Sequence, residues 1–107
     1  MSDTLERIVQ LIQAGKLKIS EHGYDEIADE GILVRDIVSH MEDAVVVEDY
    51  PNYAKGPCVL VLQRDLEGRP LHVVWGIPKG ESWPAVLVTA YRPDPDLWTE
   101  DLMRRTK

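Results

Sequence analysis

Three residues in the second half of the chain could carry acid–base chemistry on a phosphodiester. His72 lies inside GRPLHVVWGI (68–77), and Tyr91 and Arg92 end the run AVLVTAYR (85–92). Imidazole exchanges a proton near neutral pH, guanidinium stabilises charge developing on a phosphate, and tyrosine stacks on a base or donates a proton. Together they fit metal-independent RNA cleavage, in which the 2′-hydroxyl attacks the neighbouring phosphate. Each of the three also has an ordinary packing role, which remains the alternative.

Further candidates surround this group in the sequence. Tyr50 directly precedes the loop PNYAKGP, Lys55 lies within that loop, and Lys79 lies in the next turn. All three residues could bind RNA. His22 lies in the first turn of an expected helix, four residues before Glu26. It is either half of a surface ion pair or a further catalytic histidine directed at the sheet.

Metal and phosphate-loop chemistry find little support in the sequence. His22, His40 and His72 lack the spacing of a helical zinc site, and there is no Cys-x-x-Cys or glycine-rich phosphate loop. Cys58 is the only cysteine, and burial in CVLVL would raise its pKa and leave little thiolate. We therefore predict neither a metal nor a cofactor.

The charge of the chain is concentrated in one window. Residues 21–50 contain ten carboxylates and one cation, so this window carries −9 while the whole chain carries −7. The window is either a solvated face or a docking surface for a basic partner, with Glu26, Asp29 and Glu30 as candidate contacts. Because it should repel a nucleic-acid backbone, any RNA contact must come from the second half.

The elements that must position these residues follow from periodicity and capping signals. We predict helices at 3–14, from Ser20 to Gly31, at 34–42 and after Asp94, and strands at 44–50, 58–64, 70–77 and 85–92, with KLKIS as an extended link. The predicted fold class is α+β, with N-terminal helices packed on one face of a four-stranded, mainly antiparallel sheet and with a C-terminal helix.

Alternation along the strands predicts which side chains share a face. It places Leu71, Val73 and Trp75 on one face of their strand and His72 on the other. In the last strand, alternation groups Leu87, Thr89 and Tyr91. A histidine, a tyrosine and cations could thus line the sheet face opposite the helices.

Length and composition predict a single domain over residues 1–107. No apolar run approaches the roughly 18 residues that span a bilayer. The start MSDTLERIVQ lacks the basic beginning and apolar run of a signal peptide. We therefore predict a cytoplasmic protein without membrane contact.

Several stretches together resemble a bacterial family, domain of unknown function 4258. They are KISEHGYDEIADEGI, VVVEDYPNYAKGPCVLVLQRDLEGRPLHVVWGI and VTAYRPDPDLW, within about residues 17–100. The family is similar to small toxins with a RelE-like, barnase-like ribonuclease fold, and similar members often lie beside a zinc-finger antitoxin gene. The motif positions are His22, Glu48, Asp49, Tyr50, His72, Tyr91, Arg92, Asp94 and Trp98. One departure is that Glu26 and Glu30 stand where many members have arginines.

Two hypotheses from different classes follow. The resemblance implies a toxin-like RNA endonuclease of a toxin–antitoxin pair, with RNA as substrate and an antitoxin protein as partner. The acidic window instead favours a non-catalytic protein-binding module. An open surface shared by His72, Tyr91 and Arg92 or Lys79 would favour the enzyme. A His72 enclosed by another element, with both ring nitrogens bonded, would weigh against it.

Overall fold

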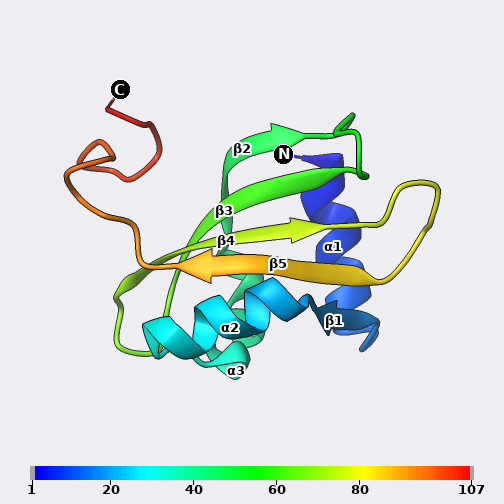
Figure 1. The fold of residues 1–107 in the computed structure, drawn as a ribbon, viewed down its shortest axis with the longest axis horizontal. Helices are drawn as coiled ribbons and strands as arrows, with labels where there is room; N and C mark the ends of the chain where they lie inside the picture. Colours follow the sequence, from blue (N-terminus) through cyan, green and yellow to red (C-terminus); the bar gives the residue numbers. More distant parts are fainter. Residues whose placement is uncertain (1, 107) are drawn as a thin grey trace.

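A five-stranded sheet forms the centre of the protein. The computed structural model describes residues 2–106, and the strand order is β1–β5–β4–β3–β2 (Figure 1). The strands are β1 (Leu17–Ile19), β2 (Val45–Tyr50), β3 (Cys58–Arg64), β4 (Pro70–Gly76) and β5 (Ala85–Tyr91). β1 pairs parallel to β5, and the other pairs are antiparallel.

The predicted α+β class is confirmed, and the predicted number of strands is wrong. The additional strand is β1, inside the segment KLKIS that was expected to be a link, and its three residues pair with Ala85–Leu87. Three residues are too few to show an alternating pattern. Pairing with β5, and not local preference, therefore makes this segment a strand.

The helices cover the rear face and one edge of the sheet. α1 (Asp3–Gln13) lies behind the strands, and the hydroxyl of Ser2 caps it by accepting from the N–H of Leu5 at 3.2 Å (Figure 1). α3 (Val34–Ser39) and the short 3₁₀ helix η1 (Met41–Asp43) replace the single helix predicted for 34–42. No helix within residues 2–106 is long and apolar enough to cross a membrane.

α2 (Glu21–Glu30) packs closely along β5. The hydroxyl of Ser20 accepts from the N–H of Gly23 and donates to the carbonyl of Val88, at 2.9 Å in each case. A Cβ at position 23 would lie 2.7 Å from that carbonyl oxygen, so only glycine allows this approach. α2 therefore covers the part of β5 beyond Leu87, where β1 is too short to pair with the β5 backbone.

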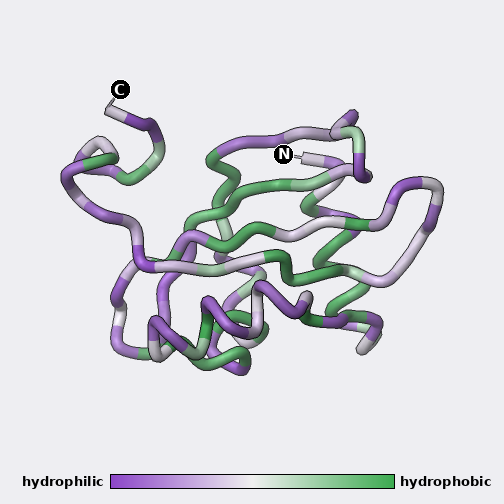
Figure 2. The backbone as a smooth tube through the Cα atoms, in the orientation of Figure 1, coloured by the Kyte–Doolittle hydropathy of each residue, from purple (hydrophilic) through white to green (hydrophobic). Residues whose placement is uncertain are grey.

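The predicted faces of β4 are confirmed. Leu71, Val73 and Trp75 are fully buried in the core with α1 and α3. The tube in Figure 2 shows the hydrophobic stretches of the central strands, in contrast to the largely hydrophilic chain after β5.

A β-bulge in β5 corrects the faces predicted for the last strand. Val74 pairs with Thr89, but Trp75 pairs with Leu87, so Val88 is an extra residue. Leu87 consequently faces the core, whereas Tyr91, which pairs with His72, lies on the opposite face. The prediction that Leu87 and Tyr91 share a face was wrong, because a bulge reverses alternation beyond it.

The predicted C-terminal helix is absent, and residues 93–106 (the 93–106 segment) form a series of turns. A first turn does begin, where the carbonyl of Asp94 accepts from the N–H of residue 97 at 2.9 Å. The side chains of Asp101 and Thr99 then bond nearby backbone N–H groups, which competes with helical hydrogen bonds. Leu102 has φ of 63°, in the left-handed region, which no α-helix contains.

Candidate functional site

His72 and Tyr91 form a pair on the sheet face opposite α1. They are register partners on β4 and β5, and the Nδ1 of His72 lies 3.3 Å from the Tyr91 hydroxyl. Their rings meet edge to face, with centroids 5.4 Å apart. The fold therefore brings together two of the residues that the sequence singled out for catalysis.

The 93–106 segment encloses this pair. His72 has no exposed surface, and its Nε2 lies 2.8 Å from the carbonyl oxygen of Leu102. The Trp98 ring packs edge to face against the imidazole at 4.4 Å. Because a carbonyl only accepts, Nε2 carries the hydrogen, and the neutral ring accepts from the Tyr91 hydroxyl at Nδ1. Both ring nitrogens are thus bonded within the fold, which weighs against a substrate reaching them in this conformation.

Enclosure also sets the ionisation of the pair. Burial lowers the pKa of His72 below its ordinary value, although its hydrogen bond to Leu102 acts in the opposite direction. Burial likewise raises the pKa of Tyr91. At neutral pH the pair therefore consists of a neutral imidazole and a protonated phenol.

The cation beside the pair is Arg105, which the sequence analysis did not single out. Its guanidinium lies 3.0 Å from a Glu48 carboxylate oxygen and 4.7 Å from the centroid of the Trp98 ring. We call this arrangement of Arg105, Glu48 and Trp98 the clasp. Arg105 lies beyond the motif stretches of the sequence, so only tertiary packing reveals its role.

Arg92 does not join the pair. Its guanidinium lies 3.1 Å from the buried carboxylate of Asp65, in the turn between β3 and β4. Burial alone would raise the pKa of Asp65. The backbone N–H groups of Arg69 and Glu67, together with Arg92, outweigh burial and lower that pKa. Arg92 therefore fastens the end of β5 to this turn.

His22 is also separate from the pair. Its side chain is 70% exposed at the start of α2, and its Nε2 lies 3.5 Å from a Glu26 carboxylate oxygen. This is the surface ion pair that the i, i+4 spacing allowed. Asp29 and Glu30 are exposed on the same helix, while Gly23 and Ile27 face inward. The acidic residues of α2 thus form a solvated face.

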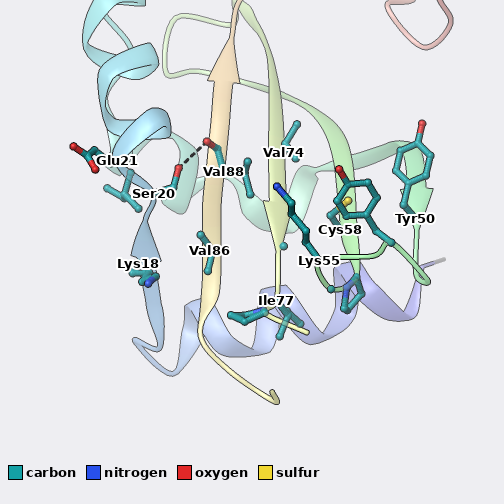
Figure 3. Close-up of a pocket in the computed structure, with 16 residues that line it drawn as sticks. Lys18, Ser20, Glu21, Tyr50, Lys55, Cys58, Val74, Ile77, Val86 and Val88 are labelled. Atoms are coloured by element: carbon teal, nitrogen blue, oxygen red, sulfur yellow. Dashed lines mark hydrogen bonds between the residues drawn. The ribbon is translucent and has the colours of Figure 1, made fainter. Parts of the chain in front are cut away.

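An open groove of about 790 Å³ occupies the other end of the same sheet face (Figure 3). Its lining comes from β1, the start of α2, the end of β2 and the loop after it, β3 to β5, and the turn after β4: Lys18, Ile19, Ser20, Glu21, Tyr50, Tyr53, Lys55, Gly56, Pro57, Cys58, Val74, Gly76, Ile77, Pro78, Val86 and Val88. Of the predicted RNA-binding residues, Tyr50 and Lys55 line this groove. Lys79 does not, although its backbone N–H donates to the carbonyl of Lys55 at 3.1 Å.

The loop after β2 holds Lys55 against the groove. Gly56 has φ of 119°, and a Cβ there would lie 2.0 Å from the carbonyl oxygen of Ile77. Only glycine fits so close to the neighbouring loop. Figure 3 shows Lys55 extending from this loop over β4 toward Val74. Burial raises the pKa of the Cys58 thiol on the groove floor, which disfavours the thiolate.

Within residues 2–106, no three His, Cys, Asp or Glu side chains gather where they could hold a metal ion. The polar groups that lie on this face include the neutral imidazole of His72, the phenols, one clasped guanidinium and two lysines. Sequence reasoning missed Arg105, the Leu102 carbonyl and Lys18. Isolated cations and backbone groups give no signal until the chain is folded.

A comparison with protein families identifies the relatives of this chain. The model of a family described as Domain of unknown function (DUF4258) matches residues 19–92, which confirms the resemblance predicted from the motifs. No curated protein and no solved structure matches the chain.

Proposed function

We propose that this chain, which belongs to the family called Domain of unknown function (DUF4258), is a toxin-like, metal-independent endoribonuclease with a RelE-like or barnase-like arrangement. The observation that carries the proposal is the His72–Tyr91 pair, which lies on the same sheet face as the open groove. An imidazole base beside a phenolic donor suits proton transfer in RNA cleavage.

The proposed reaction uses both ring positions of His72. A ring with its proton on Nδ1, directed at Tyr91, leaves Nε2 free to take the proton of a ribose 2′-hydroxyl. That oxygen then bonds to the neighbouring phosphorus, and the bond to the 5′-oxygen breaks. The leaving oxygen takes up the proton of the Tyr91 hydroxyl, and the phenolate then takes the Nδ1 proton of the His72 imidazolium, so that both side chains end neutral and a 2′,3′-cyclic phosphate remains.

The proposed site can act only when the clasp is open. The Leu102 carbonyl oxygen, 2.8 Å from Nε2, occupies the position where a reacting hydroxyl would lie. Cleavage therefore requires the 93–106 segment to leave the sheet face. Departure of the segment would also break the ion pair between Arg105 and Glu48. An antitoxin protein, of the zinc-finger type that the resemblance implies, is the proposed partner.

The experiment is expression of the chain alone in a bacterial host, followed by mapping of transcript ends. We expect the wild type to slow growth and to cut transcripts, and we expect His72→Ala and Tyr91→Phe to do neither. Tyr91→Phe keeps the ring and removes only the hydroxyl, so its folding is the safer test. His40→Ala is the matched control, because His40 follows α3 directly and its Nδ1 lies 3.1 Å from the Asp36 carbonyl oxygen of that helix. Uncut transcripts with both the wild type and Trp98→Ala, in which the clasp is lost, would end the nuclease proposal.

A non-catalytic protein-binding module is the second candidate, and the enclosure of His72 favours it. Its docking surface would be the exposed acidic face of α2. Changing Glu26, Asp29 and Glu30 to lysine should abolish binding of a basic partner protein. Reversal of the exposed Asp3 and Glu6 on α1 should not. Equal binding by both sets of variants would remove this candidate.

A further inference from the structure

We infer that the groove binds one nucleotide unit of single-stranded RNA, with its base on the groove floor and its flanking phosphates at Lys18 and Lys55. The inference rests on the proposed function in taking RNA as the ligand. It deepens that proposal by assigning the groove to the nucleotide beside the cleaved bond.

The floor of the groove is apolar. Val74, Val86 and Val88 are only partly buried, and they present aliphatic surface to the groove from β4 and β5. Gly76 adds no side chain between them, and a Cβ there would already touch Cys58 and Val88. A planar base can remove this surface from water on one of its faces.

The two lysines lie on opposite walls. Lys18 comes from β1 and Lys55 from the loop after β2, with β5, β4 and β3 between them in the sheet order. Figure 3 shows the Lys55 side chain reaching back over β4, which is two strand spacings from β1, about 10 Å. Each nucleoside within an RNA chain has a phosphate on either side, whereas a simple carboxylate or acyl anion has one charged end. Two facing cations therefore fit a nucleotide better than an amphiphile.

The lysines are available for this role. Among residues 2–106, neither Lys18 nor Lys55 takes part in an ion pair. The one carboxylate in the lining belongs to Glu21, and Figure 3 shows it directed away from the floor. The groove thus carries an excess of positive charge within a chain of net charge −7.

The groove also lies at the correct place relative to the His72–Tyr91 pair. Val74 on its floor is two residues from His72 on the same face of β4, which is about 7 Å. The half-exposed rings of Tyr50 and Tyr53 stand at the β2 side of the groove, where they can stack on a base or bond a ribose. A nucleotide in the groove would therefore be the neighbour of a phosphate above His72.

The test is an NMR titration of the ¹⁵N-labelled full chain with adenosine 3′,5′-bisphosphate, adenosine, inorganic phosphate and decanoate. We expect the bisphosphate, which carries a phosphate on either side of the nucleoside, to shift the amide signals of Val74, Val86 and Val88. We expect adenosine and phosphate to bind at least about tenfold more weakly, since each offers only half of the contacts. Tighter binding of decanoate than of the nucleotide would overturn the inference.

Lysine variants test which side chains contact the nucleotide. Lys55→Gln and Lys18→Gln should each weaken nucleotide binding by about threefold to tenfold. Lys16→Gln is the matched control, because Lys16 is exposed and lies outside the groove. Unchanged affinity in both groove variants, or shifts confined to other surfaces, would overturn the inference. Nucleotide binding without RNA cleavage would refute only the nuclease, and cleavage without groove binding would refute only the inference.

Discussion

Removal of the Trp98 side chain should uncover His72 without unfolding the domain. Trp98 is 5% exposed and packs between the His72 ring and the Arg105 guanidinium. A buried tryptophan removes about 200 Å² from water, or about 5 kcal/mol as an upper value, and replacement by alanine typically loses about 3–5 kcal/mol.

The remaining attachments of the segment are weaker than this loss. The hydrogen bond between His72 and Leu102 contributes about 1 kcal/mol. The Arg105–Glu48 pair is solvent-accessible and contributes less than about 1 kcal/mol. Ordering each residue of the segment costs about 1–2 kcal/mol in backbone entropy. In Trp98→Ala the segment should therefore detach, while the core beneath the sheet stays folded.

The assay is an NMR titration of the His72 ring together with amide exchange across residues 97–106. Burial lowers the His72 pKa in the wild type, so uncovering should raise the pKa toward its ordinary value of about 6.5. Trp83→Ala is the control, because Trp83 is 57% exposed and should leave that pKa unchanged. A His72 pKa that stays low in Trp98→Ala, with residues 97–106 still protected, would refute the reasoning.

Three further predictions concern stability. Because burial lowers the His72 pKa, the unfolded state binds the proton of this imidazole more tightly than the folded state does. The free energy of unfolding should therefore be highest above about pH 6.5 and should decrease as the pH falls below that value. Urea unfolding should find a smaller decrease in His72→Gln. Arg92→Ala removes one of the two guanidinium groups that hold the Asp65 carboxylate and should lower the urea midpoint of unfolding, and an unchanged midpoint would contradict that role. Gly23→Ala should lower the melting temperature by several degrees, because its Cβ would press on the Val88 carbonyl, whereas Asp25→Ala on the exposed side of α2 should not.

Much of the fold follows from local pattern. Ser20 and Gly31 mark the ends of α2, and alternation in β4 separates Trp75 from His72, because capping and pleating depend on neighbouring residues. The β5 bulge at Val88 is different, since it depends on register with β4. A single strand sequence does not contain that register.

In the candidate site too, some features follow from the local sequence and others only from tertiary packing. His72 and Tyr91 could be singled out by residue type and by their place in adjacent strands, whereas the face of Tyr91 depends on the β5 bulge. The Leu102 carbonyl and Arg105 could not, since they belong to a segment with helix-start signals that folds into turns. Burial of Trp98 and the side-chain bonds of Asp101 outweigh those signals. The chemistry-bearing residue types were therefore visible in the sequence, and what encloses them was not.

The most direct test of the nuclease proposal is the cleavage of single-stranded RNA by purified protein in the presence of a metal chelator. We predict products ending in 2′,3′-cyclic phosphate, formed faster by Trp98→Ala than by the wild type and absent when His72→Ala is added to Trp98→Ala. Intact RNA with both the wild type and Trp98→Ala, or equal cleavage after loss of His72, would contradict the account.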